Sequence, residues 1–491
     1  MNSKMYSYIL GFVLKIEAVC MVPAALVSLF NGESRSFFAF LITITLLLAI
    51  GIPCTLKQPT NKVIYTMGGL CVAALSWILI SIFGALPFML SNVIPSFVDS
   101  VFETVSGFTT TGASILKEVE SLPKGILFWR SLTHWIGGMG VLVFMLAITP
   151  FSAGSMLNIM RAESPGPSTS KLVPKVKQTA KILYSMYIFM TVLEIVLLVL
   201  GGMPLFDSLL NSFGTAGTGG FAIKNESIGA YHNAYFDYVI GIFMMLFGVN
   251  FNVYFLILKK QYKRSFHDEE LRTYLLIIGA AVLLITLNIH GPVYKTFSQA
   301  FRYAFFQVSS IITTTGYATA DFNKWPQFSR VILLLLMICG ACAGSTGGGI
   351  KVSRAIIAFK TSKKGLKRVF HPQSIENVRV DGKTVDNQTV ASVSVFLVLY
   401  SIIFAASVLI VSLDGFDFGT TFSSVASCLN NIGPGLGVVG PAGNFSTLSV
   451  VSKITLTLDM LLGRLEIFPI LALFSRFSWK KTHYSRGAFT A

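Results

Sequence analysis

Long apolar runs recur along this chain of 491 residues, and they restrict its fold more than any other feature. A helix that crosses a bilayer needs about 20 apolar residues, because the hydrocarbon layer is about 30 Å thick. About ten segments meet this requirement. They cover residues 6–29, 37–55, 66–90, 126–149, 183–203, 235–258, 273–289, 329–360, 391–413 and 447–475. We therefore expect an all-α polytopic membrane protein.

Composition excludes a soluble protein and gives no support to an enzyme. Hydrophobic residues make up 53% of the chain and charged residues 12%, about half the usual share in soluble domains. Cys339 and Cys342 lie in an apolar run without a second cysteine pair, which argues against redox or zinc chemistry. A membrane transferase would need clustered acids or histidines. The six histidines do not cluster: His134, His232, His267, His290, His371 and His483.

The net charge of +16 reflects membrane topology and not nucleic-acid binding. Lys and Arg gather in alternate loops, at residues 161–181, 259–272, 351–383 and 476–486. By the positive-inside rule these loops are cytoplasmic. Both termini are then expected to be cytoplasmic, with an even number of spans.

Four glycine-centred loops lie on the opposite side and can be aligned with one another. The segments are "DSVFETVSGFTTTGAS" (99–114), "DSLLNSFGTAGTGGFA" (207–222), "YAFFQVSSIITTTGYA" (303–318) and "TTFSSVASCLNNIGPGLG" (420–437). The first three share a glycine column at Gly112, Gly220 and Gly316. The fourth, aligned by Phe422 on Phe102, needs one extra residue to place Gly433 there, and Gly435 is a possible substitute. The pattern indicates an internal fourfold repeat.

Each segment is too short to span a membrane. About 12 helical residues extend ~18 Å, so the segment can only enter the bilayer and return. Non-helical backbone at membrane depth must be buried in protein or line a water-filled cavity, which predicts a shared pore. The half-helices direct their negative C-terminal ends to its centre and favour a cation. Backbone carbonyls and threonine hydroxyls offer neutral oxygens, and carboxylates are scarce except for Glu103. A monovalent cation fits better than a divalent one.

These loops, with "GFTTTGAS", "IITTTGYAT" and "CLNNIGPGLG", resemble the Trk/Ktr/HKT superfamily of potassium transporters, and most closely its TrkH/TrkG branch. The segments "HWIGGMGVLVFMLAI" (134–148), "GACAGSTGGGIKVSR" (340–354) and "LLGRLEIFPIL" (461–471) extend the resemblance over nearly the whole chain. It implies four M1-P-M2 pore-loop repeats with pseudo-fourfold symmetry. Two extra helices in residues 1–60 precede the repeats, which cover 61–155, 156–265, 266–370 and 371–491.

The resemblance implies potassium uptake through a selectivity filter at residues 108–113, 216–221, 312–317 and 429–435. The expected ion ligands are Thr110, Thr111, Gly112, Thr218, Gly219, Gly220, Thr314, Thr315, Gly316, Asn431, Ile432 and Gly433. Some sodium-conducting relatives have serine in the first glycine column, so glycine in all four columns favours potassium. The second and fourth loops depart from the Thr-rich pattern, which predicts four unequal sites. A Na⁺-conducting relative, or a K⁺/Na⁺ or K⁺/H⁺ symporter, is the alternative.

The eighth apolar run contains "GACAGSTGGG" and is expected to break in the membrane. Residues 349–351 miss the G-K-[ST] pattern of a phosphate loop, and close helix packing is the other alternative. In the resembling family this loop, here 340–350, is an intramembrane gate. The expected gating residues are Gly340, Gly344, Gly347, Gly348, Gly349, Lys351 and Arg464. Arg464 either pairs with Glu466 or Asp459, or, as the resemblance implies, faces the pore as a barrier to cations.

No segment has the pattern of a nucleotide-binding domain, so we expect K⁺ as the transported ion and no nucleotide bound by this chain. The resemblance implies regulation by a separate TrkA-like cytosolic subunit that binds NAD or ATP. It also implies a homodimer in the bacterial cytoplasmic (inner) membrane, and no nucleic-acid partner.

Overall fold

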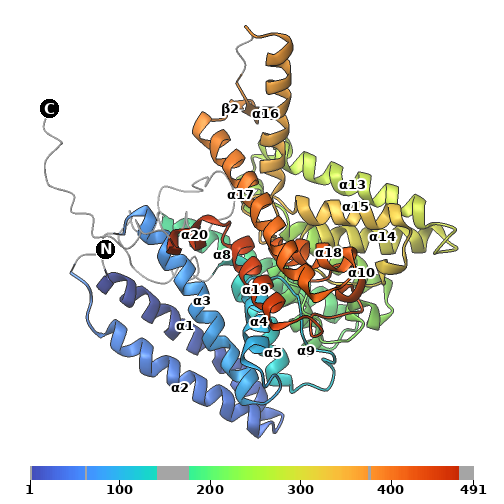
Figure 1. Cartoon of the computed structure of the whole chain (residues 1–491). Helices are drawn as coiled ribbons and strands as arrows, with labels where there is room; N and C mark the ends of the chain where they lie inside the picture. Colours follow the sequence, from blue (N-terminus) through green and yellow to red (C-terminus); the bar gives the residue numbers. More distant parts are fainter. Residues whose placement is uncertain (1–2, 61–63, 141–175, 374–376, 475–491) are drawn as a thin grey trace, which may run out of the picture.

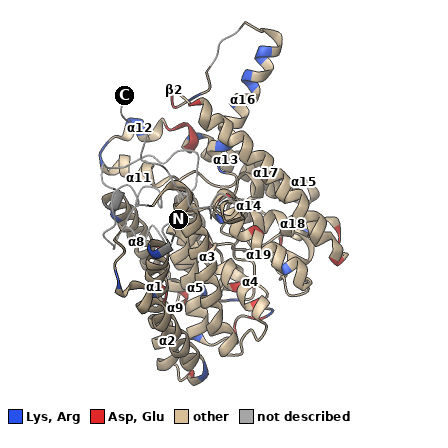
Figure 2. Cartoon of the chain, turned by 60° about the vertical axis from the view of Figure 1, so that its left-hand side comes forward, with Lys and Arg blue, Asp and Glu red and all other residues tan. Residues whose placement is uncertain are grey.

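The computed structural model describes residues 3–60, 64–140, 176–373 and 377–474. Nearly all of the regular structure in these ranges is helical, which confirms the predicted helical membrane fold (Figure 1). A small antiparallel hairpin, β1 (Arg379–Val380) with β2 (Lys383–Thr384), was not expected from the sequence. It follows α16, which projects from the helical bundle and carries several of the Lys and Arg residues (Figure 2).

Two helices precede the repeats, as expected: α1 (Ser3–Phe30) and α2 (Ser34–Leu56). They pack closely where Gly11 meets Gly51, since a Cβ atom added to Gly51 would lie 2.9 Å from the carbonyl oxygen of Gly11. The chain reverses between them at Gly32, which has a φ of +71°. Both helices lie along one side of the bundle (Figure 1).

Four units of helix, half-helix and helix follow. The first contains α3 (Thr66–Leu90), α4 (Phe97–Phe108) and α5 (Lys124–Met139). The second contains α8 (Val176–Leu200), α9 (Leu205–Gly217), α10 (Ala234–Phe247), α11 (Phe251–Leu258) and α12 (Tyr262–Phe266). The third contains α13 (Glu269–Ile289), α14 (Phe297–Ile312), α15 (Gln327–Cys339) and α16 (Val352–Phe370). The fourth contains α17 (Asn387–Val411), α18 (Phe418–Leu429), α19 (Val450–Arg464) and α20 (Phe468–Phe474).

Not every predicted span is one continuous helix. Among the described residues, α1, α2, α3, α8, α13 and α17 are each long and apolar enough to cross a membrane. The predicted run 235–258 is instead bent by 90° between α10 and α11, because Asn250 caps a new helix by accepting a hydrogen bond from the N–H of Asn252. The run 329–360 breaks between Cys339 and Val352, and the run 447–475 breaks after Arg464. The run 126–149 leaves the described residues after Gly140.

The half-helices α4, α14 and α18 begin with side-chain caps at one face of the bundle. Ser96, Thr296 and Asp417 accept hydrogen bonds from backbone N–H groups three residues later. A hydrogen bond from the Thr420 hydroxyl lowers the pKa of the Asp417 carboxyl, so this cap stays charged at the positive end of α18. The half-helices become buried toward their C-terminal ends, which places the following loops inside the protein.

Candidate functional site

The four glycine loops meet in a closed ring. The glycines are Gly112, Gly220, Gly316 and Gly433. A Cβ atom added to any of the first three would overlap a carbonyl oxygen of the next loop, and one added to the fourth would lie 2.8 Å from a carbonyl oxygen of the first. Those oxygens belong, in the same order, to Gly219, Thr315, Ile432 and Thr111. Each loop therefore contacts the next through residues of the predicted filter, and only glycine leaves room for this approach.

The same backbone conformation recurs in all four loops. Two residues in each loop, two positions apart, have a positive φ: Thr110 and Gly112, Thr218 and Gly220, Thr314 and Gly316, and Asn431 and Gly433. A positive φ is rare for threonine and costs on the order of 1–3 kcal/mol. The surrounding protein must hold this conformation. Because this conformation recurs in all four loops, the loops share one backbone structure.

Hydrogen bonds show how the loops correspond. The amide of the residue before each positive-φ glycine donates to the carbonyl five residues earlier, as Thr111 does to Ser106 at 2.9 Å and Ile432 to Ser427 at 2.9 Å. This correspondence aligns the fourth loop with the first without an insertion and corrects the extra residue inferred by placing Phe422 on Phe102. Gly433 occupies the glycine position. Gly435 lies outside it and donates to Val439 at 2.7 Å.

The first and third loops are near twins, whereas the fourth is held differently. The Oγ1 atoms of Thr109 and Thr111 lie 2.8 Å apart, and those of Thr313 and Thr315 also lie 2.8 Å apart. In the fourth loop the side-chain amide of Asn431 donates to Thr111 Oγ1 at 2.9 Å. The ring is thus geometrically fourfold but chemically unequal, as the sequence predicted.

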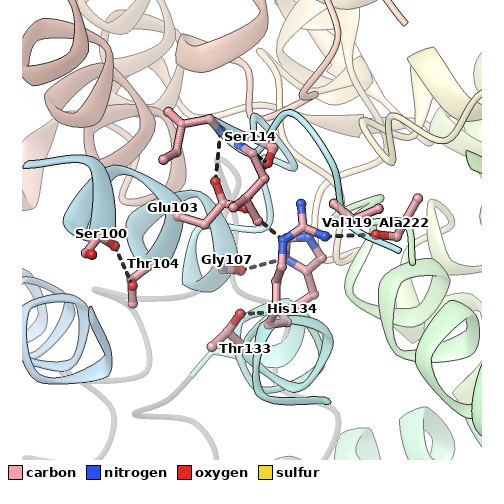
Figure 3. A network of polar contacts seen from close by, with 12 residues as sticks. Ser100, Glu103, Thr104, Gly107, Ser114, Val119, Thr133, His134 and Ala222 are labelled. Carbon is pink, nitrogen blue, oxygen red and sulfur yellow. Dashed lines mark hydrogen bonds and ion pairs between the residues drawn. The ribbon is translucent and has the colours of Figure 1, made fainter. Parts of the chain in front are cut away.

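A buried ion pair behind the first loop was not predicted. Glu103 of α4 accepts hydrogen bonds from Arg130 Nε at 2.7 Å, from Ser114 Oγ at 2.9 Å and from the N–H of Ile115 at 3.0 Å. Arg130 also donates to the carbonyl of Ala222, after the second glycine, at 2.9 Å. This network joins the first loop to the second (Figure 3).

Aromatic contacts complete this junction. The Arg130 guanidinium lies 3.6 Å from the ring centre of Phe221, and the His134 ring stacks on the same ring at 4.1 Å. His134 Nδ1 donates to the carbonyl of Gly107 at 2.6 Å (Figure 3). A Cβ atom on Gly219 would overlap the His134 ring, so the Gly-Thr-Gly-Gly sequence of the second loop makes room for this histidine.

The aligned sequences contain a signal for the side chains that hold the loops in place. Glu103, Asn211 and Gln307 occupy one column of the aligned half-helices. Asn211 Nδ2 donates to Tyr231 Oη at 3.3 Å, and Gln307 Nε2 donates to the carbonyl of Ala320 at 3.4 Å. Three polar side chains at one buried position therefore secure the segments that leave the loops.

The glycine-rich loop between α15 and α16 lies directly against the ring. The N–H of Gly348 donates to Thr314 Oγ1 at 2.6 Å, and a Cβ atom on Gly347 would lie 2.9 Å from the carbonyl oxygen of Thr313. The backbone has positive φ at Gly340, Gly344, Gly349 and Lys351. The predicted helix break and the third glycine loop are therefore in contact.

Two basic residues brace this loop. Lys351 is buried, and its Nζ donates to the carbonyl of Gly347. Arg464 donates to the carbonyl of Thr346 at 2.8 Å and to that of Gly138 at 2.7 Å. Arg464 thus joins the glycine-rich loop to the end of α5. The two acids considered as its partners have other contacts: Glu466 pairs with Arg354 at 2.5 Å, and Asp459 accepts from Ser407 at 2.8 Å.

A small cavity opens on the other side of the ring. It has a volume of about 170 Å³, and all four glycines of the ring line it. Arg130 and Ser114 also reach its wall. The glycines are therefore accessible from one side, whereas the glycine-rich loop contacts the ring at Thr313 and Thr314.

Known proteins resemble this chain over nearly its full length. The family model TrkH, described as a cation transport protein, matches residues 36–481. The Trk system potassium uptake protein TrkG of Escherichia coli (strain K12) is 35% identical over 97% of this chain and 99% of that protein. TrkH of Halomonas elongata is 34% identical over 98% of this chain and 100% of that protein. The crystal structure of the potassium transporter TrkH from Vibrio parahaemolyticus superposes with a TM-score of 0.88 at 32% identity, covering 98% and 100% of the two chains.

Proposed function

Because this chain belongs to the TrkH family of cation transport proteins, we propose that it is a multi-pass membrane protein that takes up potassium ions through the ring of four glycine loops. The observation that most supports this function is that each loop contacts the next through predicted filter residues. Relatives that match nearly the whole chain are named potassium uptake proteins, which supports the same ion here.

Neutral oxygens make the ring suitable for a monovalent cation. Threonine hydroxyls and backbone carbonyls carry partial charges that can replace the hydration shell of K⁺. Within the described part of the chain, no group of three or more His, Cys, Asp or Glu side chains could hold a metal ion. Glu103, the acid behind the ring, is neutralised by Arg130. The ring should therefore bind divalent cations weakly, because they prefer carboxylate ligands.

The glycine-rich loop and Arg464 are proposed to form the gate. The loop lies across the inner side of the ring, where it touches Thr314. Arg464 holds it through the Thr346 carbonyl and places a positive charge beside the ion path. A cation leaving the ring must displace the loop and pass this charge. Movement of the loop would then open the pore.

The side that carries α12 and α16 is proposed to face the cytoplasm, because both helices are rich in Lys and Arg. A negative membrane potential would then drive K⁺ inward with about 2.3 kcal/mol per charge for each 100 mV. We further propose a homodimer in the bacterial inner membrane, regulated by a TrkA-like cytosolic subunit that binds NAD or ATP. This subunit would dock on the basic side.

Ion flux into proteoliposomes tests the proposal. The purified protein should carry K⁺ and Rb⁺ well and Na⁺ poorly. Gly112→Ser should lower the K⁺ to Na⁺ flux ratio, because the added Cβ would overlap the Gly219 carbonyl and the φ of +79° disfavours serine. Gly279→Ser is the matched control, since a Cβ atom added there meets nothing within 4 Å. Equal K⁺ and Na⁺ flux through the unmodified protein would favour the sodium-conducting alternative.

A further inference from the structure

One buried carboxylate fastens both ends of the glycine-rich loop. Glu270 lies in the first turn of α13 and is 9% exposed. Its Oε1 accepts hydrogen bonds from the N–H of Ala343 at 2.7 Å and from the N–H of Ser353 at 3.0 Å. Ala343 lies near the start of the loop, and Ser353 lies in the first turn of α16. A single acceptor therefore holds together two backbone segments that are ten residues apart.

The preceding residue, Glu269, is attached to a different part of the protein. Its carboxylate pairs with Lys360 of α16 and accepts from the N–H of Asp381 in the β1–β2 hairpin at 3.3 Å. Its own N–H donates to Asp381 Oδ1 at 2.8 Å. Lys360 also donates to the carbonyl of Arg379 at 2.8 Å. The hairpin is thus connected to the same helical turn that holds the loop.

The loop has room to move at this attachment. A cavity of about 870 Å³ borders it, and its wall includes Asn250, Glu270, Ala343, Ser353 and Asp381. On its other side the loop contacts Thr314 of the ring. Because densely packed interiors resist displacement, a loop beside an open cavity can shift there at a lower cost than into the packed core.

We propose that Glu270 is a positioning residue for the gate and that the β1–β2 hairpin acts on the gate through it. This proposal rests on the gate function proposed above. Glu270 keeps the two ends of the loop together and the loop against the ring. A displacement of the hairpin pulls on Glu269, and the peptide bond between the two residues transmits this movement to Glu270. A protein that binds the hairpin would then alter conduction without touching the pore.

Single-channel recording in planar bilayers, with ion flux measured in parallel, tests this role. Glu270→Ala removes the shared acceptor and should raise the open probability by at least about tenfold, since two hydrogen bonds to the carboxylate are lost. The K⁺ to Na⁺ flux ratio should stay unchanged, because the ring itself is not altered. Glu270→Gln keeps the shared acceptor oxygen but loses its negative charge, which weakens both hydrogen bonds, and should give an intermediate open probability. Asp386→Asn is the matched control, because Asp386 is an exposed acid on the wall of the same cavity.

The native Cys342, which is buried in the loop, gives a second readout. Its alkylation by N-ethylmaleimide, followed by mass spectrometry, should be faster in both Glu270 variants, whereas alkylation of Cys71 in α3 should not change. This comparison separates loop release from general unfolding even if Glu270→Ala folds poorly.

The outcomes distinguish this role from the gate itself. Raised open probability with faster Cys342 alkylation supports the role of Glu270. If replacement of residues 347–349 by alanine alters the open probability but both Glu270 variants behave like the unmodified protein, the role of Glu270 is wrong and the gate remains. If neither change has an effect, the gate function is wrong. If Cys71 and Cys342 are alkylated faster to the same degree, Glu270 is only structural and the proposal fails.

Discussion

The Glu103–Arg130 pair allows a quantitative test of how the first two glycine loops are held in place. Arg130 is 3% exposed and Glu103 is completely buried. Glu103→Gln removes the negative charge but keeps the shape of the side chain. It leaves the Arg130 guanidinium buried at the wall of the small cavity beside the ring without its counter-charge.

The expected loss of stability follows from the burial of both charges. Breaking a buried ion pair by removing one partner costs about 3–5 kcal/mol, because the other charge stays buried without compensation. Hydrogen bonds from Ser114 and Ile115 to Glu103 persist in part, since the glutamine oxygen still accepts. We therefore expect the lower end of this range, about 3 kcal/mol. Arg130→Met should cost a similar amount, and the double variant should cost clearly less than the sum.

Unfolding in detergent, followed by tryptophan fluorescence, to which Trp129 beside Arg130 contributes, measures these losses where unfolding is reversible. The exposed pair of Glu120 with Lys224, whose side chains are 42% and 38% exposed, is the control. Glu120→Gln should cost less than about 1 kcal/mol. The K⁺ flux of the Glu103→Gln variant should also fall, because an uncompensated positive charge then lies at the wall of this cavity, on the proposed ion path. Additive effects of the two single variants would refute a coupling between Glu103 and Arg130.

Three further substitutions test the ring and the gate. Gly220→Ala should abolish most K⁺ flux in proteoliposomes, because the methyl group would overlap the Thr315 carbonyl; flux above half of the unmodified value would contradict close contact between the loops. Thr314→Val removes the acceptor for the N–H of Gly348 and should raise the open probability in bilayer recordings several-fold, about the effect of one lost hydrogen bond; an unchanged open probability would exclude a restraint by Thr314. Arg464→Gln should raise single-channel K⁺ conductance by removing a positive charge beside the path, whereas unchanged conductance would indicate that Arg464 is only structural.

Bilayer physics made much of this fold predictable. Apolar length identified the spans, and segments too short to cross identified the half-helices. The repeated glycines predicted four corresponding loops, and the structure gives Gly112 and Gly316 a similar positive φ. The break after Cys339 was also predictable, because so many glycines do not sustain a helix.

Other features depend on side chains that only the fold brings together. Glu103 and Arg130 lie on different helices, and nothing in either local sequence indicates that they pair. The bend after Phe247 depends on a cap at Asn250 within an otherwise apolar run. The correspondence of the fourth loop was misread because the position of Phe422 was a weaker guide than the backbone hydrogen bonds.

The four unequal junctions of the ring also affect how the proposed pore can change through mutation. In a pore made of four identical chains, one substitution appears in every quarter at once and its energetic effect is multiplied. Here Arg130 braces one junction and Asn431 another. In this single chain a substitution changes only one of the four loops, so ion preference can be altered in small increments. Such a chain can accumulate neutral differences between its quarters while the conducting path as a whole is preserved.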